Sequence, residues 1–403
     1  MSADWQTKSL WDLATINYGR SPARILADDG DYPVVGTGGS DRKGTDFLHD
    51  GDSIILGRKG TIDRVHYATG RFWTIDTAYY LSDFEGNLPQ WLYYFFQTLD
   101  LRQMNEATGV PSLSRDLLYK IEIPTPPFPE QTKIAEILST ADRAIEQTEA
   151  LIAKQQRLKT GLMQDLLTRG IDQHGNLRSE QTHPFKDSPL GRIPVEWEVS
   201  NLERCVKQNA PICYGILMPG NGVDDGIPVI KVKDIIGGRI LQNHLLLTDP
   251  KIDRQYKRSR LRAGDLVITI RGTTGRIAAV PPELDGANIT QDTARLRIKV
   301  ECSTSYFYFL LQSKGIQEQV LLHSVGQAVK GINISEVKRI SFPLPSKPEQ
   351  EAIGARMAES EHSLSRSAHH LSKLRALKTA LMQDLLTGRK RVTNLLNNPE
   401  AHA

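Results

Sequence analysis

Arginine, lysine, glycine and threonine gather in two loops whose composition suits contact with DNA. Arg58-Lys59-Gly60-Thr61 and Arg271-Gly272-Thr273-Thr274-Gly275-Arg276 each follow a short apolar run preceded by Gly-Asp. Glycine lets a backbone approach a phosphate closely, and arginine can form two hydrogen bonds with guanine. We therefore regard both loops as candidate DNA contacts. The alternative is an ordinary hairpin turn.

A basic segment, residues 251–276, is a second candidate. It holds eight Lys and Arg residues against Asp253 and Asp265, a net charge of +6. Neutralising phosphates gives affinity and register, whereas contacts to base edges give specificity. The alternative for this segment is a charged surface that faces only solvent.

Two glycine-containing stretches complete the set of candidate loops, at residues 36–39 and at 108–112, and the second has a counterpart at 325–330. The candidate DNA contacts in the first half are Gly36, Thr37, Gly38, Gly39, Arg42, Lys43, Arg58, Lys59, Thr61 and Ser112. Those in the second half are Lys231, Lys233, Lys257, Arg258, Arg260, Arg271, Thr273, Thr274, Arg276 and Lys330.

Catalytic motifs are the main alternative to a DNA-binding function, and none is complete. Thr125-Pro126-Pro127-Phe128 is similar to the Asn/Asp-Pro-Pro-Tyr/Phe loop of amino-methyltransferases, but threonine lacks the side-chain carbonyl that accepts from the target amine. Residues 57–61 lack the glycine spacing and the Gly-Lys-Ser/Thr order of a nucleotide-binding loop. The ten histidines show no His-x-x-x-His pair. We expect no catalytic residue, no metal site and no cofactor in this chain.

An internal repeat organises the chain that must position these loops. The eleven residues that begin at Leu158 recur from Leu377, at an offset of 219, and ten of the eleven positions match. Pro129-Glu130-Gln131 recurs at the same offset as Pro348-Glu349-Gln350. Upstream the similarity weakens and the offset drifts, which indicates two diverged globular modules, each followed by a repeated segment.

The repeated segments are predicted to be long helices. Counting from Ile134 to Leu166 in steps of four and three gives seven apolar residues in ten positions, and the same count from Ile353 to Leu385 gives seven again. Such a seam, sustained over about five heptads, predicts a coiled coil in which the two helices pack on each other. Each helix has Pro near its start and Gly just after its end, as expected for helix boundaries.

The globular modules are expected to be α+β. Residues 53–56 and 266–270 are apolar runs bounded by Gly and Asp, which predicts strands, and the aromatic runs 91–96 and 306–311 predict buried helices. The fold class is therefore two similar mixed α/β domains and two long antiparallel helices, with pseudo-two-fold internal symmetry. The expected boundaries are 1–129 and 197–348 for the domains, 130–170 and 349–388 for the helices, 171–196 for a linker and 389–403 for a flexible tail.

Composition sets limits on the environment and on the partners. The 403 residues are 39% hydrophobic and 24% charged, with no apolar run long enough to span a membrane and no signal-peptide pattern. Three scattered cysteines argue against a disulfide framework and favour the cytoplasm. Residues 1–196 carry a net charge of −6 and residues 197–403 a net charge of +9. The basic half favours a polyanionic partner, and the acidic half does not.

The duplicated order of these motifs resembles the specificity subunit of type I restriction-modification systems. The resemblance rests on the Pro-Glu-Gln segments, on the repeated Leu-Lys-x-x-Leu-Met-Gln-Asp-Leu-Leu-Thr ends, and on Tyr32-Pro33-Val34-Val35-Gly36-Thr37-Gly38-Gly39 and Gly191-Arg192-Ile193-Pro194-Val195-Glu196-Trp197 at the two domain entries. The second domain departs from it, since Ile227-Pro228-Val229-Ile230-Lys231-Val232 lacks Gly-Thr-Gly-Gly. The two domains are therefore expected to read different sequences.

The resemblance implies a non-catalytic DNA-reading scaffold. Each domain would read one half of a bipartite double-stranded target, and the helices would set the spacing and dock two methyltransferase (modification) subunits. It also implies S-adenosylmethionine in those subunits, and ATP and Mg²⁺ in restriction subunits, whose presence it leaves open. Two alternatives remain: a coiled-coil assembly scaffold without DNA function, and a combined DNA methyltransferase.

Apolar residues outside the helix–helix seam are the expected docking points for the modification subunits, because exposed apolar surface on a lone chain favours association. The candidate partner contacts are Leu151, Leu158, Leu162, Leu166, Leu377, Leu381 and Leu385.

Overall fold

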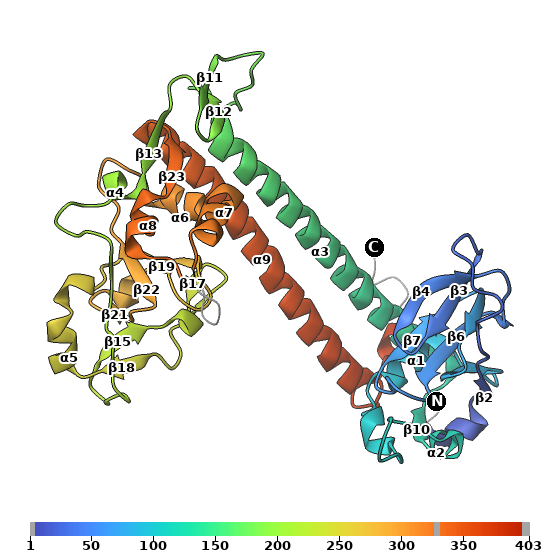
Figure 1. Cartoon of the computed structure of the whole chain (residues 1–403). Coiled ribbons are helices and arrows are strands. Elements are labelled where there is room, and N and C mark those ends of the chain that lie inside the picture. The colour runs from blue at the N-terminus through green and yellow to red at the C-terminus, as the bar shows by residue number, and fades with distance from the viewer. Residues whose placement is uncertain (1–4, 326–330, 397–403) are drawn as a thin grey trace. The chain divides into compact units, whose positions relative to one another are not determined.

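The computed structural model describes residues 5–325 and 331–396 (Figure 1). The chain forms two compact units. Unit 1 comprises Met1–Leu151 together with Ala368–Ala403, and unit 2 comprises Ile152–Ser367. Each unit thus holds one globular domain and one half of each long helix. The predicted α+β class and the internal repeat are both confirmed.

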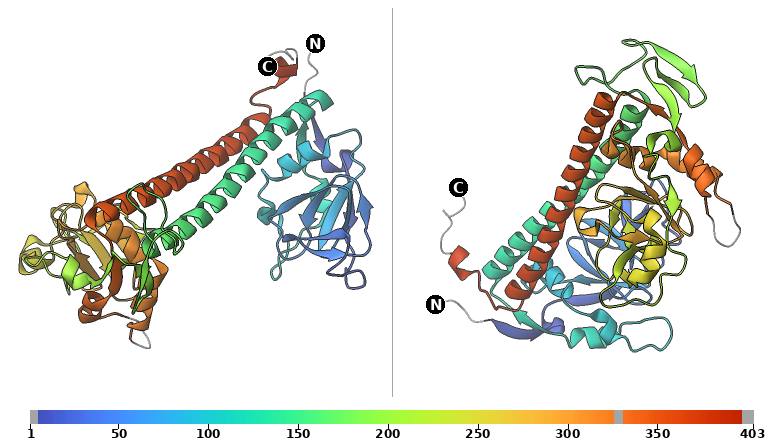
Figure 2. Two further views of the ribbon diagram at one scale, coloured as in Figure 1. Left: turned by 90° about the horizontal axis from the view of Figure 1, so that it is seen from above. Right: turned by 90° about the vertical axis from the view of Figure 1, so that its left-hand side faces the viewer.

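The two long helices are α3 (Phe128–Thr168) and α9 (Lys347–Leu385), and Figures 1 and 2 show them side by side. Residues with higher numbers on α3 contact residues with lower numbers on α9, so the helices are antiparallel within each unit. These polar pairs are Asp142–Lys378 and Glu149–Arg375 in unit 1, and Gln155–Ser363 and Lys159–Glu361 in unit 2. The polar residues that interrupt the predicted seam therefore find partners across it.

Unit 1 contains a pair of strands, two four-stranded sheets and the buried helix α1 (Pro89–Phe96), in blue and cyan in Figure 1. The pair is β1 (Gln6–Ser9) with β10 (Glu122–Thr125). The first sheet has the order β2 (Thr15–Tyr18), β9 (Ala78–Ser82), β6 (Ser53–Gly57) and β7 (Val65–Ala68). The second has the order β4 (Gly39–Gly44), β3 (Tyr32–Gly36), β8 (Arg71–Thr74) and β5 (His49–Asp50). The remaining elements of this unit are the short helices η1 (Leu10–Asp12), η2 (Leu101–Met104), α2 (Arg115–Tyr119) and α10 (Thr393–Leu396).

Unit 2 repeats this plan with shorter strands. The pair is β13 (Glu198–Asn201) with β23 (Ser341–Leu344). The four-stranded sheet has the order β14 (Cys213–Tyr214), β22 (Thr293–Leu296), β19 (Leu266–Thr269) and β20 (Ile277–Ala279). The other sheets are β18 (Leu246–Thr248), β15 (Ile227–Ile230) and β21 (Asn288–Ile289), and the pair β16 (Ile235–Ile236) with β17 (Arg239–Ile240). Its helices are α4 (Leu202–Cys205), η3 (Val232–Asp234), α5 (Pro250–Gln255), η4 (Lys257–Ser259), η5 (Pro282–Leu284), α6 (Thr304–Gln312), α7 (Lys314–Leu322) and α8 (Ile334–Arg339).

Packing explains why the apolar runs form these elements. All residues of β6 and β19 are buried, which accounts for runs without polar alternation. The aromatic helices α1 and α6 lie in the main cores of their units, together with Ile134 and Leu138 of α3 in unit 1 and Ile353 and Met357 of α9 in unit 2. Each domain is thereby packed onto the start of one long helix.

The predicted linker, 171–196, is instead an ordered part of unit 2. It contains the antiparallel hairpin β11 (Phe185–Ser188) and β12 (Gly191–Pro194). Arg178, which lies in this segment, is buried against the carboxylate of Glu349. The same carboxylate accepts the backbone N–H of Ile171 at 2.9 Å and the indole N–H of Trp197 at 3.0 Å. The glycines and prolines that suggest a linker form tight turns here, as at Gly191 with φ +93°.

The predicted flexible tail also begins as ordered structure, in unit 1. Arg391 donates to both carboxylate oxygens of Glu130, at 2.9 and 2.5 Å, and Val392 is buried in the core. The indole N–H of Trp5 donates to the same carboxylate at 3.4 Å. Both ends of the described chain therefore meet at the start of α3, and residues 397–403 lie outside the described residues.

The glutamine of each Pro-Glu-Gln segment fixes the domain helix beside it. Gln131 accepts the backbone N–H of Leu88, which precedes α1, at 2.8 Å, and donates to Asn87 at 2.9 Å. Gln350 accepts the backbone N–H of Ser303, which precedes α6, at 2.9 Å. Both glutamines are 2% exposed. These contacts explain why the Pro-Glu-Gln segment is repeated. In each unit its glutamate binds the segment that follows the other long helix, and its glutamine binds the residue that precedes the buried helix of the domain.

Candidate nucleic-acid interface

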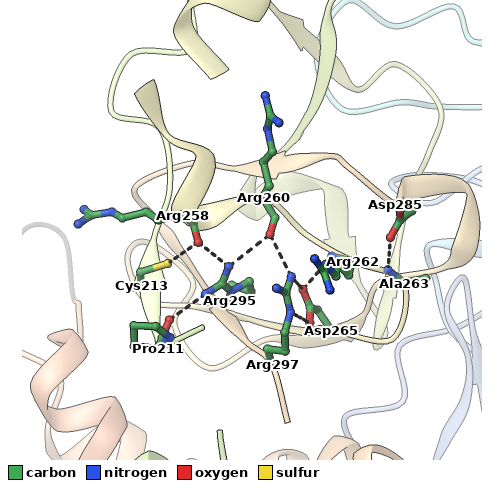
Figure 3. Close-up of polar contacts among 10 residues, drawn as sticks. All are labelled: Pro211, Cys213, Arg258, Arg260, Arg262, Ala263, Asp265, Asp285, Arg295 and Arg297. Carbon is green, nitrogen blue, oxygen red and sulfur yellow. Dashed lines mark hydrogen bonds and ion pairs between the residues drawn. The ribbon is translucent and has the colours of Figure 1, made fainter. Parts of the chain in front are cut away.

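The basic segment of unit 2 lies on a framework of two arginines from β22 and the residues that follow it. Arg295 donates to the carbonyl oxygens of Arg258, Arg260 and Pro211 (Figure 3). Arg297 donates to the carbonyl of Arg260 at 3.2 Å. These bonds hold the backbone of the segment, and Figure 3 shows the side chain of Arg258 pointing away from the framework.

Of the two framework arginines, Arg295 is buried and Arg297 is half-buried beside an acidic side chain. Arg297 forms an ion pair with Asp265 at 2.7 Å, and Asp265 is 3% exposed. The hydrogen bonds that Arg297 donates to this carboxylate raise the pKa of Arg297, whereas burial lowers the pKa of Arg295. Neither Arg295 nor Arg297 is among the contacts predicted from the sequence. Their i, i+2 spacing, which places both side chains on one face of a strand, is the signal that could have identified them.

Three predicted contacts in this segment differ in what their side chains do. Lys257 and Arg258 are exposed. Arg260 forms an ion pair with the fully buried Asp253, which also accepts from Asn288 at 2.8 Å. The guanidinium of Arg260 therefore holds the segment to the domain, a role the charge count alone does not reveal.

The loop between β19 and β20 is a tight turn that carries both exposed and structural cations. Arg271, Gly272 and Thr273 are exposed, and Thr274 is half-buried. Arg276 donates to the carbonyl oxygen of Ile235 at 3.0 Å and so anchors the neighbouring segment. Two further predicted contacts lie just before Ile235: Lys231 is half-buried and Lys233 is exposed. Lys330 lies outside the described residues.

In unit 1 the glycine-rich stretch forms the turn of a hairpin. Gly36 pairs with Gly39, and Thr37 and Gly38 lie between the strands β3 and β4. The carbonyl of Thr37 is 3.1 Å from Nε2 of His66, which ties the turn to β7. Arg42 and Lys43 are exposed on β4, the outer strand of its sheet.

The second candidate loop of unit 1 is braced by the segment before α2. Lys59 forms a β-bridge with Ser112, and Gly60 N–H donates to the carbonyl of Pro111 at 2.9 Å. Lys59 is exposed, whereas Thr61 and Ser112 are half-buried. The structure therefore brings together two sequence-predicted contacts that lie about fifty residues apart.

A tyrosine flanked by arginines lies beside this loop and is not among the contacts predicted from the sequence. Tyr18, the last residue of β2, is 46% exposed. The guanidinium carbons of Arg58 and Arg115 lie 5.4 and 5.3 Å from its ring centroid. In unit 2, Tyr214 is the last residue of β14, and Arg258 lies 5.6 Å from its ring centroid.

The candidate partner contacts on the long helices fall into two groups. Leu151, Leu158 and Leu377 are 47, 61 and 53% exposed. Leu166 and Leu385 are instead buried in the cores of their own units, so their assignment as partner contacts is corrected to core positions. Leu162 and Leu381 are partly buried against the same cores.

Within the described residues 5–325 and 331–396, no group of three or more His, Cys, Asp or Glu side chains could hold a metal ion. None of the helices in that part of the chain is long and apolar enough to cross a membrane.

The model of the type I restriction modification DNA specificity domain matches this chain twice, over residues 2–155 and 224–366. The chain is 31% identical over 277 residues to the specificity subunit of the type I restriction enzyme EcoBI of Escherichia coli, an alignment that covers 66% of this chain and 58% of that subunit. The chain therefore spans less than two thirds of that relative's length. It is 25% identical over 312 residues to the MjaVIII specificity subunit of Methanocaldococcus jannaschii, which covers 75% of this chain and 71% of the relative.

Solved structures share the fold. The S subunit of the type I restriction-modification system of M. genitalium superposes with a TM-score of 0.64 and 18% identity, over 95% of this chain and 96% of that one. A chain from a study of complex assembly and conformational transition in the type I restriction-modification system gives 0.56 at 15% identity, over 96% of this chain and 98% of that one. At these identities the likeness establishes the architecture alone.

Proposed function

Because the chain belongs to the family of type I restriction-modification DNA specificity proteins, we propose that it selects the DNA sequence on which a methyltransferase complex acts. Each unit reads one half of a bipartite double-stranded target. The observation that supports this most strongly is the repeated plan: the same sheet order occurs twice, whereas the cations at the loops differ between units. Two similar frameworks with different reading groups are what two different half-sites require.

The chain acts without catalysis of its own in this proposal. Modification subunits supply S-adenosylmethionine chemistry, and restriction subunits, where present, supply ATP- and Mg²⁺-dependent cleavage. The complex works in the cytoplasm, where its DNA substrate lies. The threonine of Thr125-Pro126-Pro127-Phe128 supports this division of labour, because Thr125 is buried and its hydroxyl donates to the carbonyl of Ile123 at 2.9 Å.

Two modification subunits dock on the long helices. The exposed leucines Leu151, Leu158 and Leu377 support this, because they are large apolar side chains on otherwise polar helix faces. Replacing all three with glutamine should leave the helical signal of the chain unchanged and abolish co-purification with the modification subunit. A matched control replaces Lys154, Gln156 and Lys373, exposed polar residues of the same helices, with alanine. Retained binding by the leucine variant would place the docking surface elsewhere.

Sequencing of DNA methylated by the assembled complex tests the proposed function. A single bipartite motif, with two short specific halves and an unspecific gap, is the expected product. A coiled-coil scaffold without DNA function would give no motif, and a combined methyltransferase would methylate DNA without the separate modification subunit.

A further inference from the structure

The arginines on Tyr18 come from separate parts of unit 1 and meet on one exposed ring. Tyr18 ends β2, Arg58 follows β6, and Arg115 begins α2. The ring of Tyr18 also packs edge-on against the buried Tyr79, at 5.2 Å between centroids. Three elements of the domain therefore hold this cluster in place, and a rigid mounting is typical of groups that recognise a ligand with geometric specificity.

Within the part of the chain that the structure describes, the guanidinium groups of Arg58 and Arg115 have no acidic partner. Other arginines of unit 1 form ion pairs: Arg71 with Asp50, and Arg102 with Asp63. Among the described residues, neither Arg58 nor Arg115 forms an ion pair, and the Nε of each is buried without a hydrogen-bond partner. Two adjacent cations without an acid favour a ligand that is rich in hydrogen-bond acceptors.

Half-burial favours a base edge over a phosphate as that ligand. Phosphates are contacted well by long, exposed side chains such as Lys59 on the same loop. Arg58 and Arg115 are half-buried, and each guanidinium lies over the ring of Tyr18, which limits the orientations it can take. A planar guanidinium held in one orientation fits the O6 and N7 acceptors of guanine.

Unit 2 has a related cluster at the corresponding strand end, with one exposed arginine in place of two half-buried ones. Tyr214 ends β14, which pairs with β22 as β2 pairs with β9 in unit 1. Its arginine, Arg258, comes from η4, whereas the arginines of the unit 1 cluster follow β6 and begin α2. Arg295 and the thiol of Cys213 both donate to the carbonyl of Arg258, so this arginine also has a fixed backbone. Different elements thus bring arginine to the same strand end in both domains.

We propose that Tyr18 with Arg58 and Arg115 forms the base-reading site for a guanine in one half of the target, and that Tyr214 with Arg258 does so for the other half. This inference rests on the proposed function. The tyrosine positions the guanidinium groups, and the arginines make the contact.

The test uses the assembled methyltransferase complex and measures methylation across a library of duplexes randomised in both half-sites. Arg115→Lys keeps the charge but removes the planar fork, and is expected to reduce discrimination for guanine at one position by roughly 5- to 150-fold in one half-site only. Arg258→Lys is expected to do the same in the other half-site. Tyr18→Leu, which keeps bulk but removes the aromatic ring, should weaken discrimination at the position that Arg115→Lys affects.

Lys59→Gln is the matched control, because Lys59 is exposed on the same loop. It should weaken methylation by a similar factor for all sequences. If Arg115→Lys behaves like this control, the arginine contacts phosphate and the base-reading inference is wrong. An intact opposite half-site in each variant shows that the chain is folded. If the wild-type complex showed no preference for a bipartite sequence, the proposed function itself would be wrong. This result differs from the one that contradicts only the base-reading inference.

Discussion

Arg178 and Glu349 form a buried ion pair, although 171 residues separate them in the sequence. Their side chains are only 10 and 9% exposed. Arg391 and Glu130 form the corresponding pair in unit 1, where the carboxylate side chain is 3% exposed. In both units the segment that follows one long helix is thereby fastened to the start of the other.

Glu349→Ala should destabilise unit 2 by about 3–5 kcal/mol, because it leaves the guanidinium of Arg178 buried without a partner. Urea unfolding followed by circular dichroism measures the change. Glu318→Ala removes an ion pair whose side chains are 63 and 90% exposed, and should change stability by less than about 1 kcal/mol. Equal effects of the two substitutions would show that the buried pair does not support the fold.

Arg295→Lys should impair reading of the second half-site although Arg295 faces the protein. Lysine cannot reach three carbonyl oxygens with a planar fork, so the backbone of the basic segment loses donors. We expect a stability loss of about 1–3 kcal/mol and weaker methylation at sites that depend on the second half. Normal methylation of such sites by the variant would mean that the framework is not needed for reading.

The structure identifies which cations of the basic segment are suited to phosphates. Lys251, Arg254 and Lys257 are exposed, whereas Arg260 is held by Asp253. Replacing the three exposed residues with glutamine should reduce the slope of log K against log salt by roughly 0.9 for each phosphate that is no longer neutralised, with similar weakening for all sequences. Lys314→Gln on α7 is the control. A slope unchanged from the wild type would mean that the segment faces solvent in the complex.

The helix halves offer insertion points that preserve each unit. The boundary between units falls between Leu151 and Ile152 in α3 and between Ser367 and Ala368 in α9. One heptad inserted at both points adds about 10 Å of helix without altering helix pairing within either unit. The gap of the methylated motif should lengthen while both specific halves stay the same. Changed bases with an unchanged gap would contradict a role for the helices as a ruler.

The elements that local sequence specifies were predictable. The repeated eleven residues and the apolar seam predict α3 and α9, and the apolar runs predict β6, β19, α1 and α6. Their boundaries shift by one to three residues, as where α3 begins at Phe128 instead of residue 130. Periodicity and capping residues lie within these segments, so no knowledge of distant contacts is needed.

Contacts between distant segments were not predictable. Arg178 of the segment 171–196 pairs with Glu349, and Arg391 pairs with Glu130, so the glycine and proline content of 171–196 and the terminal position of 389–403 were both misleading. For the candidate site, charge counting selects segments rich in cations, but it could not separate the exposed Lys257 from Arg260, which is paired with the buried Asp253. Arg115 and Tyr18 carry no local signal, because only the fold brings them together.

Exchange of one domain tests the central claim most directly. Residues 202–344, which start after β13 and end with the last residue of β23, are replaced by the aligned segment of the M. jannaschii relative. The motif that the assembled complex methylates is then determined by sequencing. The account predicts a motif in which one half is new, while the other half and the gap are those of the wild-type chain. A motif altered in both halves, or in neither, would contradict the claim that each unit reads its own half of the target.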